Sequence, residues 1–128
     1  MAIRIVRLGS VRAPNEGLRV GTVRRPPRGV PRSEIALQNW YDVWYPNLAP
    51  SDATLKFGRQ AASAGDWNTF TRRYRAEMKK PEAARSIALL AALSQHADFS
   101  VGCYCEDETH CHRSILRDLF KESGAKLA

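Results

Sequence analysis

Apolar and β-branched side chains gather near the two ends of the chain in a pattern that predicts β-strands. Residues 3–8 and 18–23 are rich in isoleucine, leucine and valine, and a turn-forming stretch at 14–17 separates them. Toward the other end, residues 99–105 are again aromatic and β-branched. We therefore expect three strands over these ranges, with the last in the interior of a sheet.

The middle of the chain has apolar residues at helical spacing. Its clearest stripe follows Asp66, which we expect to cap the helix, and consists of Trp67, Phe70, Tyr74 and Met78. Such a stripe is more typical of a core face than of a surface that stacks on bases. Strands at both ends with helices between them predict an α/β fold, in which a small, partly parallel sheet is flanked by helices in two or three layers.

Local signals predict where other elements begin. Ser51 or Asp52 would cap one helix, and Pro81 suits the first turn of another that covers residues 82 to about 96. Residues 24–32 include three prolines and a glycine. Because proline fits neither a helix interior nor a central strand, this stretch is expected to be a rigid loop.

Length and composition indicate a single core. A chain of 128 residues that is 44% hydrophobic is long enough for one domain, which we place at residues 1–128. No stretch approaches the roughly 18 apolar residues of a membrane span, and residues 1–7 lack the apolar region of a signal peptide. Three cysteines are a poor framework for disulfides. These features predict a cytoplasmic protein without a membrane partner.

The positive charge of the chain is concentrated near its N-terminus. The net charge is +7, and residues 1–32 carry eight arginines against the single carboxylate of Glu16, whereas the remaining residues balance. Arginine binds phosphate through two parallel hydrogen bonds, so this basic segment favours a nucleotide or nucleic acid as partner. The alternative is that some of these arginines only cover the solvent side of an edge strand.

All three cysteines, two of the three histidines and an arginine lie within residues 103–113. The cluster spans a junction from strand to helix, because residues 114–121 have apolar positions at helical spacing. Side chains two residues apart on a strand point the same way, so the thiols of Cys103 and Cys105 would share a face.

The helix after the cluster would begin at Cys111 and run to about Lys121, with Arg113 in its first turn and Thr109 as its cap. The free N–H groups of that turn, together with Arg113, gather positive potential beside the Cys111 thiol. Such a corner suits an anion or a thiolate.

Several interpretations of the cysteines stay open. Cys103 alone is equally consistent with a core residue. Zinc or iron could be bound by Cys103, Cys105 and Cys111 with His110 or His112, although C-x-C followed by C-H differs from the C-x2-4-C spacing of structural zinc sites. Cys111 could instead be a nucleophile with His112 as its base.

Several blocks of the chain resemble one family. The spacing from Cys103 to Cys111 and the triplet that ends at Arg113 resemble the C-x-E…C-H-R signature of the domain-of-unknown-function family 488 (DUF488). Cys105 stands where that signature has glutamate. Further blocks look like the YeaO-like branch of the family, namely Arg24 with residues 27–30, and residues 48–51, 57–58 and 67–77. The resemblance implies a small α/β domain of bacterial or archaeal type and favours anion recognition, without assigning a reaction.

Two hypotheses follow. In the first, the protein binds a phosphate-bearing ligand at the strand-to-helix pocket, with catalysis, if any, by Cys111, His112 and Arg113. The ligand-binding residues expected there are Arg24, Arg28, Ser51, Arg73 and Tyr74. In the second, the cysteine cluster itself acts, as a metal site or as a nucleophile. The chain lacks the G-x-G-x-x-G, P-loop, HExxH and serine-elbow motifs, so these familiar cofactor and hydrolase signatures do not indicate a reaction.

Overall fold

The computed structural model of the protein describes residues 1–128. Its strands and α-helices are, in chain order, β1 (Ile3–Arg7), β2 (Leu18–Gly21), β3 (Val43–Trp44), α1 (Asp52–Gln60), α2 (Ala64–Met78), α3 (Pro81–Leu93), β4 (Phe99–Cys103) and α4 (His112–Glu122). Three short 3-10 turns complete the chain: η1 (Arg32–Glu34), η2 (Pro46–Leu48) and η3 (Glu108–His110). None of the helices is both long and apolar enough to cross a membrane.

The sheet has the strand order β1-β4-β2-β3, and every pair of neighbouring strands is parallel. Strand β4 lies in the interior, as the sequence predicts, and all five of its residues are buried. The α/β class is therefore confirmed. Because all four strands run in one direction, their carboxyl ends meet at a single edge, which is where α/β proteins commonly bind ligands.

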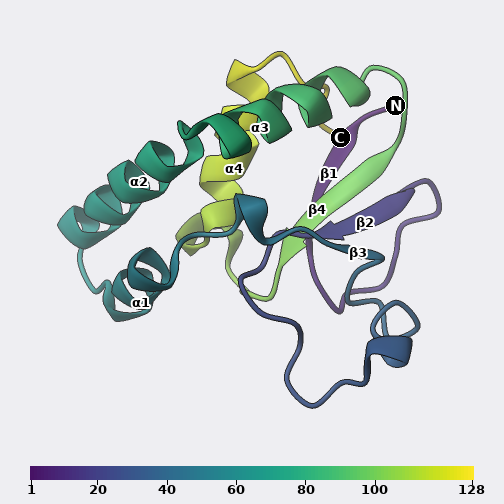
Figure 1. Cartoon of the computed structure of the whole chain (residues 1–128), viewed down its shortest axis with the longest axis horizontal. Coiled ribbons are helices and arrows are strands. Elements are labelled where there is room, and N and C mark those ends of the chain that lie inside the picture. The colour runs from purple at the N-terminus through teal and green to yellow at the C-terminus, as the bar shows by residue number, and fades with distance from the viewer.

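The α-helices lie to one side of the sheet (Figure 1). The main core forms where α2, α3 and α4 pack on the sheet face that carries Ile3, Val20 and Val101. The aromatic stripe of α2 belongs to this core, with Phe70 and Tyr74 both buried. Its interpretation as a core face is therefore confirmed for these two rings.

No helix covers the second face of the sheet. The segments that follow β1 and β2 take its place, and the long connection between β2 and β3 contains only the turn η1 (Figure 1). These segments approach the sheet closely. A Cβ atom added to Gly21 would lie 2.5 Å from the Tyr41 ring, and one added to Gly102 would lie 2.6 Å from the Leu8 side chain. Both contacts are too short for any other residue, so glycine is required at both strand positions.

A fully buried ion pair joins these segments to the sheet. Arg19 of β2 donates to both carboxylate oxygens of Glu16, at 2.6 and 2.8 Å. Its third guanidinium nitrogen donates to the carbonyl oxygens of Ser10 and Asn39, at 2.9 and 2.7 Å. Ser100 of β4 donates to Glu16 at 2.7 Å. Arg19 was expected in a polyanion-binding segment, but it is 0% exposed and acts inside the fold.

Two helix caps differ from the prediction. Ser63, not Asp66, is the N-cap of α2: its hydroxyl oxygen accepts from Asp66 N at 3.1 Å, while the Asp66 carboxylate accepts from Ala62 N at 3.1 Å. This reciprocal arrangement resembles a capping box, so Asp66 contributes from the first turn. Thr109 lies within η3, and Cys111 is the N-cap of α4 without a capping hydrogen bond from its side chain.

The buried pair makes a testable contribution to stability. Burial alone would raise the pKa of Glu16, but hydrogen bonds from Arg19 and Ser100 outweigh it and lower the pKa from 4.5 to about 2. A carboxylate with a lowered folded-state pKa stabilises the fold above its unfolded pKa, and this contribution is lost as the pH falls through the folded value. We expect Glu16→Gln to lower the free energy of unfolding at neutral pH by about 3–5 kcal/mol, because it leaves a buried cation unpaired.

The same variant should flatten the loss of stability between pH 4.5 and pH 2. Urea unfolding across this range measures both effects. Glu122→Gln is the matched control, because it removes a carboxylate from the more exposed pair with Arg75 and should change stability far less. Equal costs for the two variants would contradict the role assigned to the buried pair.

Candidate functional site

A cleft of about 980 Å³ lies at the carboxyl edge of the sheet. Its walls come from the residues that follow three strands: 7–10 after β1, 23–28 after β2 and 103–105 at the end of β4. Residues of α1, the first part of α2 and the start of α4 complete it. The parallel order of the strands brings these distant segments together.

The charged side chains that line the cleft are predominantly positive. Its arginines are Arg7, Arg24, Arg25, Arg28 and Arg59, and Asp52 is its only carboxylate. Arg25 forms an exposed ion pair with Asp52 at 2.8 Å. Arg28 and Arg59 are exposed and form neither a side-chain hydrogen bond nor an ion pair. Two guanidinium groups at the cleft are therefore free to bind an anion.

Arg24 has a structural role as well as a place in the cleft. Its guanidinium donates to the carbonyl oxygens of Pro50 and Ala49, both at 3.1 Å. These bonds tie the loop after β2 to the residues that precede α1. Only part of the Arg24 guanidinium is left for a ligand.

Thiols and an imidazole form the base of the cleft. Cys103, Cys111 and His112 are all buried, and their potential ligand atoms lie within 4.8 Å of one another. This group could therefore hold a metal ion. Cys105 is exposed, and its Sγ atom lies 3.7 Å from that of Cys103.

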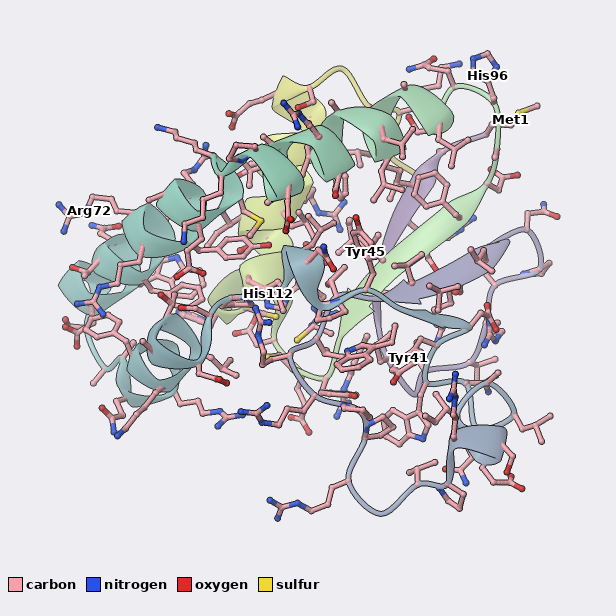
Figure 2. All side chains as sticks on the ribbon, viewed as in Figure 1. Met1, Tyr41, Tyr45, Arg72, His96 and His112 are labelled. Carbon is pink, nitrogen blue, oxygen red and sulfur yellow. The ribbon has the colours of Figure 1, made fainter.

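His112 is fixed in one tautomer by the backbone. Its Nε2 atom lies 2.9 Å from the carbonyl oxygen of Thr22. Because a carbonyl oxygen can only accept, Nε2 must carry a proton, and in the neutral ring this leaves Nδ1 with a free lone pair. Nδ1 lies 3.8 Å from the Cys111 Sγ atom. Figure 2 shows His112 in the interior of the molecule, whereas Arg72 and His96 point outward. The histidine can thus accept a proton or bind a metal on the side of the thiol.

The thiols differ in their affinity for a proton. Hydrogen bonding with Cys105, and then with Cys111, raises the pKa of Cys103 above its ordinary value. The hydrogen bond from Cys103 lowers the pKa of Cys105, and the charge of Arg113 acts in the same direction. The pKa of Cys111 is also lowered, first by its hydrogen bond with Cys103 and then by His112.

Arg113 lies beside the cluster but does not line the cleft. It is 3% exposed and donates through Nη2 to the carbonyl oxygen of Cys105. Its Nε atom is buried without a hydrogen-bond partner. The side chain lies in the first turn of α4, as the sequence predicts. It supplies a buried positive charge next to the thiols.

Three other predicted ligand-binding residues lie outside the cleft lining. Ser51 caps α1, and both its amide and its hydroxyl donate to Glu77, at 2.8 and 2.7 Å. Tyr74 is fully buried and donates to the carbonyl oxygen of Leu48 at 2.7 Å. Arg73 lies over the Phe57 ring, 4.5 Å from its centroid. The structure thus joins Arg24 and Arg28 to the Cys-His cluster but leaves these three side chains in supporting positions.

One arginine of the cleft, Arg59, is not predicted from the sequence, because it lies on α1 and no local motif marks it. Arg7 belongs to the basic N-terminal segment that was expected to bind an anion, and it lines the cleft. His110 also lines the cleft, with its Nδ1 atom 3.0 Å from Asp107 and its ring against Trp67. The sequence marked His110 as an alternative metal ligand to His112, but only His112 belongs to the group of converging donors.

One further pattern in the sequence has a clear structural outcome. Residues 111–117 have the C-x5-R spacing of cysteine phosphatases. Here, however, residues 112–117 are helical, so their backbone does not form a loop around an anion. Arg117 is paired with Glu108 at 2.8 Å, and it does not line the cleft. The pattern therefore does not form a phosphatase loop.

Comparison with known proteins identifies a family. Residues 3–124 match the family model DUF488-N3a, which is described as the active DUF488-N3 subclade. Because the match spans nearly the whole chain, it shows that the protein belongs to this family. No curated protein and no solved structure shows a significant match. Assignment to the YeaO-like branch stays a prediction.

Burial predicts which thiol a reagent reaches first. In chelator-treated protein, iodoacetamide should label Cys105 before Cys103 and Cys111, because only Cys105 is exposed. Mass spectrometry of the labelled peptides over time measures the order. Cys105→Ser should remove the fast phase and leave the slow phases unchanged. Labelling of Cys111 as fast as that of Cys105 would contradict the burial of the cluster.

Proposed function

This protein belongs to the DUF488 family, and we propose that it binds a phosphate-bearing ligand, a nucleotide or a nucleic acid, in the arginine-lined cleft. The observation that carries the proposal is the charge of the lining, in which five arginines face one carboxylate. A cleft with such a balance attracts anions and raises their local concentration. The description of the matched subclade as active supports a reaction at the bound group. We propose Cys111 and His112 as its catalytic residues, with the buried charge of Arg113 supporting them from outside the cleft lining.

The positions of the two unpaired arginine side chains favour a phosphate over a simple carboxylate as the bound group. Arg28 comes from the loop after β2, whereas Arg59 comes from the last turn of α1. Guanidinium groups from two walls can contact several oxygens of one phosphate, or two successive phosphates, each through paired hydrogen bonds. The first N–H groups of α4 lie at the base of the same cleft, since Cys111 and His112 line it. The free N–H groups of a helix N-terminus further stabilise a bound anion.

The aromatic residues of the cleft favour a ligand that also carries a base. Trp40 and Tyr104 pack edge to face with ring centroids 5.8 Å apart, and both line the cleft after different strands. Trp67 lies on the α2 side. Aromatic rings beside a basic groove are typical of nucleic-acid and nucleotide sites, where bases stack on them. The volume of the cleft also falls within the range of ligand-binding clefts.

Arg28→Ala should weaken this binding. The probes are ATP and a short single-stranded oligonucleotide, with quenching of tryptophan fluorescence as the measurement. Loss of one charged contact should reduce affinity by about tenfold or more. The affinity of wild-type protein for the oligonucleotide should fall with salt, with a log-log slope of about −0.7 per neutralised phosphate, and the variant should show a shallower slope.

Arg32→Ala is the matched control, because Arg32 is exposed nearby in the chain but does not line the cleft. It should leave affinity for both probes nearly unchanged. Equal losses for the two variants would indicate diffuse attraction rather than a site. Absence of binding by wild-type protein at low salt would rule out the proposed function.

The second candidate function is metal binding by the cysteine cluster. It is favoured by one observation, the convergence of Cys103, Cys111 and His112 within 4.8 Å. Thiolate and imidazole donors suit zinc, and thiolates also hold iron in many proteins. We therefore propose zinc or iron as the metal, which would supply a Lewis acid or hold the two segments of the cluster together.

Purified protein should contain about one metal ion per chain by elemental analysis. Removal of the ion with a chelator should lower the melting temperature, because an ion that binds only the folded state stabilises it. His112→Ala should abolish both effects, whereas His96→Ala, at an exposed histidine remote from the cluster, should change neither. Metal binding would be ruled out if the purified wild-type protein contained no metal and its melting temperature did not change when zinc or iron was added.

A further inference from the structure

We infer that zinc held by Cys103, Cys111 and His112 has a fourth coordination position that opens into the cleft, and that Cys105 occupies this position as an exchangeable ligand. The inference rests on the second candidate function. It assigns Cys105 a role different from the other two thiols, because a phosphate oxygen from the cleft would replace it on the metal. The metal site and the arginine-lined cleft would then act on the same ligand.

The spacing of the three fixed donors suits a tetrahedral ion. A zinc–sulfur bond of about 2.3 Å places two tetrahedral ligand atoms about 3.8 Å apart. The Cys111 Sγ atom and the His112 Nδ1 atom are 3.8 Å apart, and the complete group of three lies within 4.8 Å. Shifts of less than about 1 Å would therefore bring all three donors to bonding distance.

The supporting contacts of these donors resemble those of known metal sites. The Nε2–H group of His112 donates to the Thr22 carbonyl at 2.9 Å, which fixes the ring and leaves Nδ1 for the ion. Histidine ligands of metals almost always donate their other nitrogen in this way. Cys103 is the last residue of an interior strand, and His112 begins α4, so both ligands are positioned by regular elements.

Cys105 differs from the fixed donors in two respects. It belongs to the loop after β4 and is exposed, whereas the other thiols are buried. Its Sγ atom is 3.7 Å from that of Cys103, which is a tetrahedral spacing, yet it lies outside the group of donors that are mutually within 4.8 Å. It can reach the ion after a small movement of the loop. It is therefore placed to coordinate zinc without being required to hold it.

The charges favour an exchange at this position. Two thiolates neutralise Zn²⁺, and a third gives the site one negative charge, which the buried guanidinium of Arg113 beside Cys105 offsets. An anionic oxygen of a phosphate could take the place of the Cys105 thiolate with little change in total charge. Sites with three protein ligands and one exchangeable ligand are typical of catalytic zinc, whereas structural zinc has four permanent ligands.

The test compares wild-type protein with Cys105→Ala and Cys103→Ala, each loaded with Zn²⁺ or with Co²⁺ as a spectroscopic substitute. Competition with a chelator gives the zinc affinity, and the cobalt absorption bands report the number of thiolate ligands and the coordination geometry. Inorganic phosphate is then added to the cobalt-loaded proteins. We expect Cys105→Ala to retain one ion per chain with an affinity within about tenfold of wild type, and Cys103→Ala to lose more than about 100-fold.

The cobalt spectra should show one thiolate fewer in Cys105→Ala, and phosphate should shift the bands of this variant at lower concentration than those of wild type. Loss of metal from Cys105→Ala as complete as from Cys103→Ala would show a closed four-ligand site and overturn the inference while the second candidate stands. A spectrum of Cys105→Ala that does not respond to phosphate would also overturn it. Failure of wild-type protein to bind either metal would overturn both.

Discussion

The guanidinium of Arg19 holds the irregular segments on the second face of the sheet against β2. It is fully buried and joins β2 to Glu16 and to the backbone of two irregular segments, at Ser10 and Asn39. A buried charge that loses its partners costs several kcal/mol, so these segments are fixed in place without a helix to support them. Ser10 lines the cleft, and so does Trp40, the residue that follows Asn39. The shape of the cleft thus depends on an ion pair on the far side of the sheet.

The position of the thiols follows from the sheet in the same way. Strand β4 pairs with a neighbour on each side and ends at Cys103, and after a short loop α4 begins at His112. This connection brings a buried thiol at the end of the strand against the first turn of the helix. The carbonyl of Thr22, just beyond the end of β2, then orients His112. The end of β4 and the start of α4 therefore supply the candidate metal-binding side chains, and the distant residue Thr22 supports one of them.

Sequence patterns predicted the elements on either side of the cluster because these depend on local periodicity. The strand from Phe99 and the helix that carries Arg113 in its first turn are both present. Such local patterns could not predict which arginines are buried and which line the cleft. Arg19 looks like the other arginines of the N-terminal segment in sequence, and its buried role depends on contacts that local patterns do not show, such as those with Ser10 and Asn39. Likewise, Cys105 is exposed because the strand ends two residues earlier, a boundary that local composition does not mark.

The connection between β2 and β3 is an irregular segment without an α-helix. Parallel strands are commonly joined by a helix, whose buried face restricts the sequences that it accepts. Here residues 22–42 form a crossover with a single 3-10 turn, and its first half is a wall of the cleft. Loops tolerate insertions and substitutions better than packed helices do. A change of sequence in this crossover would therefore reshape one wall of the cleft without disturbing the helical core or the thiol-lined base.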